Sequence, residues 1–524
     1  MRRGVVSPPP KDLESTPHKR SGSRGGVKDR TSSRNKGQLS WLFPHSGILC
    51  YLVKVVLASV CLVAALGTAL AFSYEARKDK YLLYSQADVS YSFVHLSYVK
   101  PSNGPEKDAE DAAEKKEIEA DGYQFYKRLN ARGDSRVSRL RYMHMGMLEQ
   151  LPNGSVAAFF QSSESRFEGV FDQSIYWSVS DDHGATWNHP QTLISSNRKL
   201  PIWSPVAHRS EDRIFLFYSK STKFCEYFDK SKGVMRHSPG GDVFFVSSDN
   251  NGSSWTFPQK LLAYEEQEPA TTGAGAGESK VSESSEGEGS GGLLEDKANS
   301  RSGQPYGVPK VIANKLTVLS NGAWLLPYWR EPGRTCPVIR SGLPRSQWVN
   351  GSASVVYTEN QGLSWHTSGE VSNKDTWLIE SSIAEVQKHG VLLQMFRTKA
   401  GQAYRGYSRD MGRTWTDPVR TYLPNPNSKM CILELPNGNV LATYNHSSMK
   451  RTPLSLAVSK DGGVFWTTVA HLETDPELQF AYPTMQIVGD DLFVIYSVMS
   501  KQSGVLESVG MKTAKLSVQR LLKY

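Results

Sequence analysis

The chain is poor in the residues and patterns that mark metal proteins, nucleotide-binding proteins and disulfide-rich domains. Only five of its 524 residues are cysteine, and Cys50 and Cys61 lie in an apolar stretch near the start. The other three, Cys225, Cys336 and Cys431, allow one disulfide at most, and the sequence leaves the pairing open. Neither a C-x-x-C nor an H-E-x-x-H spacing occurs, nor a glycine-rich phosphate loop. We therefore expect neither a metal nor a cofactor.

A broad basic surface is also missing. The chain carries a net charge of +9, but residues 1–46 alone hold ten Lys or Arg against three acidic residues. That tail contributes +7, which leaves +2 for the rest of the chain. The basicity therefore indicates membrane topology rather than nucleic-acid binding, and we expect no nucleic-acid partner.

One long apolar run is present. Residues 55–72 are uncharged and long enough to span a bilayer, and residues 47–53 extend the apolar stretch. Because the run begins too late for a cleavable signal peptide, we predict a transmembrane signal anchor at 47–72. The positive-inside rule places residues 1–46 in the cytosol. This predicts a single-pass type II membrane protein whose main domain is luminal or extracellular. Four glycosylation sequons fit that prediction: Asn153, Asn251, Asn350 and Asn445.

Two polar segments divide the rest of the chain. Residues 73–138 are rich in charge and are interpreted as a stalk. Residues 265–303 are rich in Gly, Ser and Glu and cannot bury apolar area, so we predict a disordered surface loop there. The remaining residues within 139–524 are expected to form the folded domain.

A short motif recurs five times in this domain, with Ser or Thr, then Asp or Asn, then Gly, then Trp at fixed offsets. The acidic or amide side chain can accept hydrogen bonds from nearby backbone N–H groups, and the Gly permits a positive φ. We interpret the motifs as β-turns that stabilise the fold rather than as catalytic sites. The copies are "SDDHGATW" (180–187), "SDNNGSSW" (248–255), "TENQGLSW" (358–365), "SRDMGRTW" (408–415) and "SKDGGVFW" (459–466).

A second repeat consists of two alternating apolar runs around a turn, which is typical of a β-hairpin. Six copies occur, at 148–160, 206–219, 316–329, 384–397, 433–445 and 487–497, and five of them are followed by a box motif. A four-stranded sheet repeated radially closes into a propeller whose first strands line a central channel. The sequence therefore predicts an all-β, six-bladed β-propeller.

Polar residues occupy matched places relative to these hairpins. Glu380 stands ten residues before the hairpin glycine Gly390, and His144 stands ten before Gly154. Arg397 follows Gly390 by seven residues. Because propellers place function at the channel mouth, we expect these side chains to converge there, together with Tyr482 of the last hairpin and Arg451 after the fifth.

Over roughly residues 139–515 the chain resembles the sialidase superfamily, in its Asp-box branch with BNR repeats. The box motifs carry the resemblance together with "EGVFD", "ESSIAEV…MFR", "LPNPNS", "YNHSSMKRTPLSLAVS" and "FAYPTMQ", which occur in the family's order. The resemblance implies a glycoside hydrolase that removes a terminal acidic sugar, sialic acid or a related one, from a glycan with retention. With the predicted anchor, this hydrolase would be held at a membrane.

The resemblance also implies roles for individual residues. Tyr482 would be the nucleophile and Glu380 the base that takes its proton, because a phenol needs activation. Arg397 and Arg451 would clamp the substrate carboxylate. For the acid/base we prefer Asp172, with Glu168 as the alternative. Sugar cleavage through a tyrosine is an exception to the paired-carboxylate rule.

The sequence departs from the family at one place. His144 stands where the first clamp arginine belongs, so the arginine triad is incomplete and a different acidic sugar is conceivable. Asn427 and Arg330 are lesser candidates for substrate contacts. Two further hypotheses stay open: a lyase acting on a uronic-acid glycan with His144 and Tyr482 as proton-transfer groups, and a carbohydrate-binding propeller without catalysis.

Overall fold

The computed structural model describes residues 82–97, 140–165, 167–222, 227–229, 234–236, 238–267, 306–331, 351–386, 390–502 and 505–524. The chain divides into two compact units, residues 1–77 and 78–524, and all described residues belong to the second. The predicted tail, the predicted anchor and most of the predicted stalk and loop lie outside the described residues. Within the ranges given above, no helix has the length and apolar character needed to span a bilayer.

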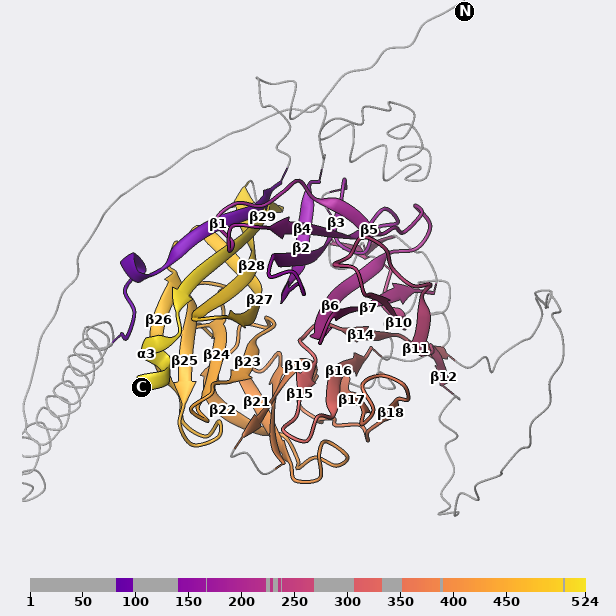
Figure 1. The fold of residues 1–524 in the computed structure, drawn as a ribbon. Helices are drawn as coiled ribbons and strands as arrows, with labels where there is room; N and C mark the ends of the chain where they lie inside the picture. Colours follow the sequence, from indigo (N-terminus) through magenta and orange to yellow (C-terminus); the bar gives the residue numbers. More distant parts are fainter. Residues whose placement is uncertain are drawn as a thin grey trace, which may run out of the picture. The chain divides into compact units, whose positions relative to one another are not determined.

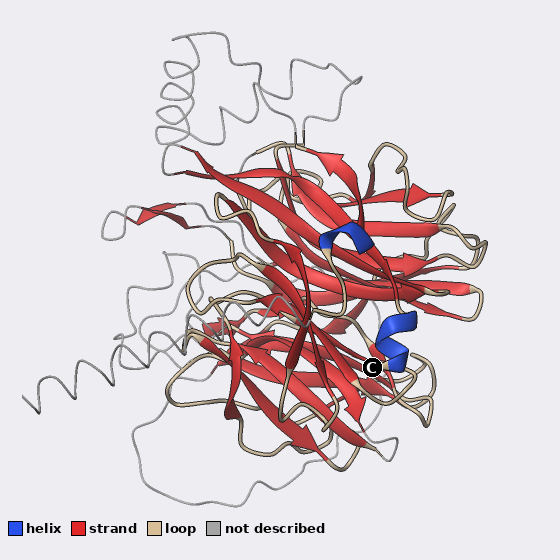
Figure 2. Ribbon diagram, turned by 90° about the vertical axis from the view of Figure 1, so that its left-hand side faces the viewer, coloured by secondary structure: helices blue, strands red, loops and turns tan. Residues whose placement is uncertain are grey.

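The described part is built almost entirely of antiparallel strands (Figure 2). Its only helices are the 3₁₀ turn η2 (Gln86–Asp88) and α3 (Gln519–Lys523). Three four-stranded sheets have consecutive strands. They consist of β2 (Tyr142–Gln150), β3 (Val156–Ser163), β4 (Ser174–Ser180) and β5 (Gln191–Ile194); β19 (Ile379–Val386), β20 (Val391–Arg397), β21 (Gln402–Ser408) and β22 (Val419–Pro424); and β23 (Cys431–Glu434), β24 (Val440–Asn445), β25 (Leu454–Ser459) and β26 (Thr467–Glu473).

A fourth four-stranded sheet joins the two ends of the second unit. Its order is β1-β29-β28-β27, so the N-terminal strand pairs with the last strand of the chain. The strands are β1 (Ser90–Leu96), β27 (Leu478–Val488), β28 (Asp491–Gln502) and β29 (Val505–Ser517). The prediction that residues 73–138 form only a stalk is therefore wrong for 90–96, because these residues complete a sheet of the folded domain.

The remaining sheet has nine strands. It contains one run, β6-β7-β10-β11, and a second run, β16-β17-β18 with β15, and β14 pairs with both β10 and β16. Its strands are β6 (Ile202–Ser210), β7 (Arg213–Ser221), β10 (Gly241–Ser248), β11 (Gln259–Leu262), β14 (Lys310–Ile312), β15 (Thr317–Val318), β16 (Trp324–Arg330), β17 (Ser352–Thr358) and β18 (His366–Thr367). Four blades are separate sheets, so the predicted count of six is not confirmed. Two small ribbons pair β8 (Tyr227–Asp229) with β9 (Val234–Arg236) and β12 (Glu265–Gln267) with β13 (Tyr306–Val308).

Within this unit the sheets are arranged around a centre, as in a propeller (Figure 1). The inner strands follow one another around the ring, because β27 contacts β2, β2 contacts β6, and β19 contacts β23, which in turn contacts β27. Apolar side chains fill the space between neighbouring sheets and form several buried clusters. The inner strands therefore bring distant stretches of chain together at the centre.

The two sequence repeats form the elements that the sequence predicts. All six predicted hairpins are antiparallel strand pairs. In the first box, Ser180 Oγ accepts a hydrogen bond from Gly184 N at 2.8 Å, and Asp182 Oδ1 accepts one from Thr186 N at 2.8 Å. Gly184 has φ +82°, and an added Cβ would lie 2.5 Å from Phe493 Cε1. The boxes are therefore turns that pack tightly against the neighbouring sheet.

The structure bears on one predicted sequon and on one of the three cysteines considered for a disulfide. Asn445 is 2% exposed and donates from Nδ2 to the carbonyl of Phe480 at 2.9 Å. The asparagine of this sequon is therefore buried in the folded domain, so it gives no support to a luminal or extracellular placement. Cys431 is buried and forms no disulfide within the described ranges, whereas Cys225 and Cys336 lie outside them.

Candidate active site

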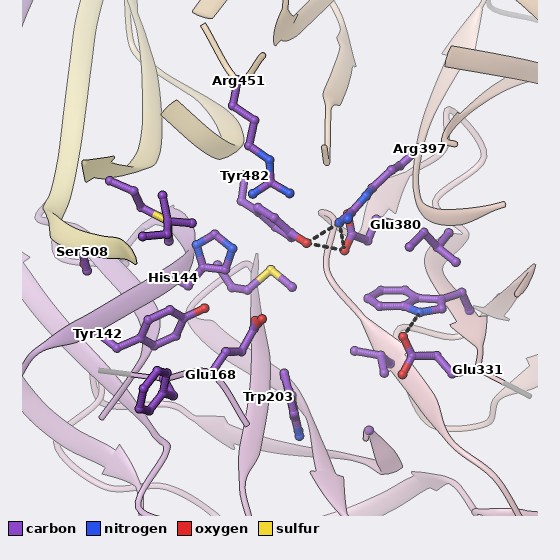
Figure 3. A pocket seen from close by; sticks show the side chains of 18 of the residues that line it. Tyr142, His144, Glu168, Trp203, Glu331, Glu380, Arg397, Arg451, Tyr482 and Ser508 are labelled. Carbon is purple, nitrogen blue, oxygen red and sulfur yellow. Dashed lines mark hydrogen bonds and ion pairs between the residues drawn. The ribbon is translucent and has the colours of Figure 1, made fainter. Parts of the chain in front are cut away.

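A cavity of about 310 Å³ lies where β2, β6, β19 and β27 come together (Figure 3). Six of the nine residues predicted for a site line it. They are His144, Glu168, Glu380, Arg397, Arg451 and Tyr482. Its walls also include Tyr142, Glu331 and three tryptophans, Trp203, Trp329 and Trp377. The cavity thus combines aromatic surface with a few charged groups, which is typical of a small-molecule site.

The inner strands share a backbone irregularity at the cavity. Four of them have a register shift there, and at each shift one non-glycine residue adopts a positive φ. These residues are Met145 (57°), Ser204 (49°), Glu380 (47°) and Tyr482 (57°). A β-bulge redirects a side chain, and a left-handed conformation is costly for a bulky residue such as tyrosine. The surrounding structure must therefore hold these positions.

Buried polar side chains support two of the bulges. Asn314 donates from Nδ2 to the carbonyl oxygens of Glu380 at 2.8 Å and Met430 at 3.1 Å. Lys429 donates from Nζ to the carbonyl of Pro483 at 2.8 Å and to Thr484 Oγ1 at 2.6 Å, next to Tyr482. Burial lowers the pKa of the Lys429 ammonium to about 8. Each bulge is thus fixed by a side chain from a neighbouring segment.

Tyr482, Glu380 and Arg397 form one hydrogen-bonded group in the cavity (Figure 3). Tyr482 Oη donates to Glu380 Oε1 at 2.8 Å. Arg397 Nη1 donates to both carboxylate oxygens of Glu380 at 2.7 Å and also contacts Tyr482 Oη. Burial raises the pKa of the Tyr482 phenol, and the positive charge of Arg397 offsets only part of the rise. The phenol therefore stays protonated at neutral pH unless a base takes its proton, and Glu380 is placed to do so.

The two predicted clamp arginines differ in what they contact. Arg397 is engaged by Glu380 and Tyr482, and its Nε donates to Asn427 Oδ1 at 2.9 Å. Arg451 donates from Nη2 to the carbonyl of Asn427 at 3.1 Å and lies over the Tyr482 ring, 5.5 Å from its centroid. Asn427 does not line the cavity, but it accepts a hydrogen bond from each arginine and so orients both. Arg451 is therefore better placed than Arg397 to bind a ligand carboxylate.

His144 lies beside the phenol. The ring centroids of His144 and Tyr482 are 4.0 Å apart, and His144 Nδ1 is 2.8 Å from Ser497 Oγ. Burial lowers the pKa of the His144 imidazole well below its ordinary value, and the positive charges of Arg451 and Arg397 lower it further. The residue at the place of the first clamp arginine is therefore a neutral hydrogen-bonding group.

The structure separates the two acid/base candidates. Glu168 lines the cavity, and its carboxylate points into it (Figure 3). Asp172, which the sequence favoured, does not line it. Its Oδ2 instead accepts hydrogen bonds from the backbone N–H groups of Glu164 at 3.1 Å and Ser165 at 3.3 Å. Asp172 therefore closes the loop that carries Glu168, and of the two candidates only Glu168 lines the cavity.

Arg330 is the third predicted residue outside the cavity lining. It donates from Nη1 to Ser354 Oγ at 2.5 Å, across the β16–β17 pair. Sequence reasoning in turn missed Tyr142, which lines the cavity near Glu168, whose charge helps burial raise the pKa of the Tyr142 phenol. The available signal was its spacing, because Tyr142 and His144 are two apart on one strand and share a face. Among the described residues no group of three or more His, Cys, Asp or Glu could hold a metal ion.

Comparisons with known proteins agree with this architecture. A family model described as "BNR repeat-like domain" matches residues 154–288 and 295–495, which is more than half of the chain. A sialidase from Bacteroides fragilis (strain YCH46) is 22% identical over 171 residues, 31% of this chain and 31% of that protein. The match thus spans about a third of that relative.

Solved structures show the same fold at low identity. The Hadza microbial sialidase Hz136 has a TM-score of 0.50 at 15% identity, over 73% of this chain and 66% of that one. The sialidase of Trypanosoma rangeli, solved as a covalent intermediate with 2,3-difluorosialic acid, has a TM-score of 0.50 at 16% identity. That match covers 74% of this chain and 56% of the other. At these identities the likeness concerns the fold.

Proposed function

Because this chain belongs to the BNR repeat-like family of sialidase-type propellers, we propose that it is a retaining glycoside hydrolase that removes a terminal acidic sugar from glycans. One observation carries the proposal: Tyr482 Oη lies 2.8 Å from Glu380 Oε1 inside a cavity that Arg451 also lines. A buried phenol next to a carboxylate base is the arrangement that an activated tyrosine nucleophile needs.

The first step forms a covalent intermediate. Arg451 binds the carboxylate of the sugar and orients its anomeric carbon toward Tyr482. Glu380 takes the phenol proton while Tyr482 Oη bonds to the anomeric carbon. The bond to the leaving-group oxygen breaks, and Glu168 gives that oxygen its proton.

The second step releases the sugar. Glu168 takes a proton from water, whose oxygen bonds to the anomeric carbon. The bond to Tyr482 Oη breaks, and Glu380 returns the proton to the phenol. Two displacements at one carbon retain its configuration.

Three finer features belong to the same proposal. We count the nine-stranded sheet as two blades, because its two runs correspond to two of the predicted hairpins, and this gives six blades. We propose that residues 47–72 anchor the chain in a membrane and that residues 1–46 stay cytosolic, on the charge balance of the sequence. The propeller would then be luminal or extracellular.

The experiment is turnover of fluorogenic glycosides by the full-length chain. The panel contains a sialoside, other acidic sugars and a neutral sugar. The proposal expects release from an acidic sugar with retention, lost in Tyr482→Phe and kept in Tyr496→Phe. Tyr496 is a matched control, because it is another buried tyrosine that donates to a glutamate, Glu473, at 2.5 Å, and it does not line the cavity.

One observation favours a second candidate function, a lyase: the neutral His144 ring lies 4.0 Å from the Tyr482 ring. A lyase acting on a uronic-acid glycan would leave an unsaturated product that absorbs ultraviolet light. That product, in place of a hydrolysed sugar, would contradict the hydrolase. Glycan binding unchanged by Tyr482→Phe and Glu380→Gln, without turnover of any substrate, would indicate a binding module.

A further inference from the structure

Two buried glutamines tie the loop that carries Glu168 to the neighbouring inner strand. Gln161 donates from Nε2 to Glu168 Oε1 at 3.0 Å, and its own Oε1 accepts from Ser204 N on β6 at 2.8 Å. Gln173 accepts from Gly169 N at 2.8 Å and donates to the carbonyl of Ile202 at 2.8 Å. Both glutamines are 0% exposed. Only Gln161 contacts the carboxylate itself.

The orientation of the Gln161 amide is fixed by its partners. Ser204 N–H is a backbone donor and can only donate, so the Gln161 atom that faces it must be the oxygen. The amide nitrogen then faces Glu168 Oε1, and an amide nitrogen can only donate. A carbonyl oxygen accepts a hydrogen bond better than the hydroxyl oxygen of a protonated carboxyl. The Gln161 hydrogen bond to Oε1 therefore favours Oε2 as the oxygen that carries the proton of Glu168.

We propose that Gln161 is a positioning residue that holds the Glu168 carboxyl at the cavity and favours Oε2 as the site of its acidic proton. This inference rests on the proposed function, in which Glu168 is the acid/base. It assigns Gln161 a part in proton delivery, although the side chain itself does not line the cavity.

The other groups near Glu168 can follow a change in its charge. Tyr142 of β2 lies near both Glu168 and Gln161, and its hydroxyl can donate or accept a hydrogen bond. Ionised Glu168 acts through its charge on Arg451 and Tyr482. Gln161 differs from these groups, because its amide nitrogen can only donate to Oε1 and its amide oxygen is held by Ser204 N at the β6 bulge.

The first test compares Gln161→Met with Glu168→Gln in the full-length chain, on acidic glycosides with good and poor leaving groups. Loss of general-acid catalysis slows a poor leaving group by about 10²- to 10⁴-fold and affects an activated aryl group much less. We expect Gln161→Met to show the same selectivity, with a loss of at least about tenfold for the poor leaving group. An equal loss on both substrates would overturn the proposal.

The matched control is Gln394→Met. Gln394 is also fully buried, and it donates from Nε2 to Ser381 Oγ at 2.9 Å on β19, without a contact to Glu168. Any activity lost in this variant should be lost equally for good and poor leaving groups. If Gln394→Met showed the leaving-group selectivity of Gln161→Met, the selectivity would come from a nonspecific loss of packing in the core. That result would contradict the proposal.

The second test is Gln161→Glu, which keeps the acceptor for Ser204 N–H but places two carboxyl groups within hydrogen-bond distance. Like charges at this separation raise the pKa of the pair. The alkaline limb of the kcat/KM profile, where the acid is lost, should move to higher pH by about one unit or more. A purely structural role would leave that limb where it is.

A third readout does not need activity. In a crystal structure of Gln161→Met, the Glu168 carboxyl should leave its place beside residue 161, and in Gln394→Met it should stay. If Glu168 does not move in Gln161→Met, the positioning role of Gln161 is wrong and the proposed function is unaffected. If Glu168 moves but the wild-type chain turns over no acidic glycoside, the proposed function is wrong and the positioning contact is supported.

Discussion

The cavity contains two tyrosine–glutamate pairs that are built differently. Tyr482 and Glu380 both lie on bulged inner strands, and Arg397 donates two hydrogen bonds to the carboxylate. Tyr142 also lies on an inner strand, but its partner Glu168 lies on the loop between β3 and β4 and is held by the amide of Gln161. Arg397 thus places a full positive charge against one carboxylate, and Gln161 places a neutral donor against the other.

This difference fits the two chemical tasks. A base next to a nucleophile must be ionised before the reaction, and a guanidinium favours the ionised form. An acid/base must give up and regain a proton in each turnover, which a neutral partner permits. Glu380 therefore starts the reaction beside a fixed cation, and Glu168 starts it beside a neutral amide.

The largest difference is expected between the two tyrosines. Tyr482→Phe removes the nucleophile and should reduce turnover by at least about 10³-fold. Tyr142→Phe removes the hydroxyl beside Glu168 and should cost about tenfold, mainly on poor leaving groups. Steady-state rates of the two variants on the same pair of substrates measure this. Equal losses in both variants would contradict the assignment of different roles.

The next largest effect concerns stability. Arg397→Met leaves the buried carboxylate of Glu380 without its cation, which should cost about 3–5 kcal/mol of unfolding free energy. Adding Glu380→Gln should restore part of the loss, because the remaining partner is then neutral. Chemical denaturation of the two variants and the double variant measures this. A double variant no more stable than Arg397→Met would show that the ion pair is not the source of the loss.

The smallest effect concerns the loop of the second pair. Burial raises the pKa of the Asp172 carboxyl to about 6 from an ordinary value of 3.8. The folded state therefore binds this proton more tightly than the unfolded state, and stability falls as pH rises from about 4 to 6. Asp172→Asn should flatten this part of the Tm-versus-pH curve without producing the leaving-group selectivity of Glu168→Gln. A curve with the wild-type slope would contradict the shift.

Local patterns made most of the fold predictable. The box motifs and hairpins are built from contacts within about fifteen residues, so turn chemistry and alternation were sufficient to find them. The closing strand β1 was missed because its partner, β29, is more than 400 residues away along the chain. The segment "SYSFVHL" contains no pattern that indicates which strand it pairs with. The bridge by β14 was missed for the same reason, because strand order within a sheet is a long-range property.

The part of the candidate site that depends on a residue's position along its hairpin could be predicted from the sequence. Glu380 and Tyr482 were found because each stands on an inner strand just before a recognisable turn. The choice between Asp172 and Glu168 depended on how one loop folds, and the contacts of Gln161 and Gln173 decide that. Such side-chain contacts between blades leave no pattern in a single sequence.

The central claim is that Tyr482 attacks the sugar. The most direct measurement is mass spectrometry of the full-length chain after incubation with a 2,3-difluoro derivative of the acidic sugar that it hydrolyses fastest, the class of reagent bound covalently in the Trypanosoma rangeli enzyme. The account predicts one adduct, on the peptide that contains Tyr482, and none in Tyr482→Phe. An adduct on another residue, or a product with inverted configuration, would contradict it.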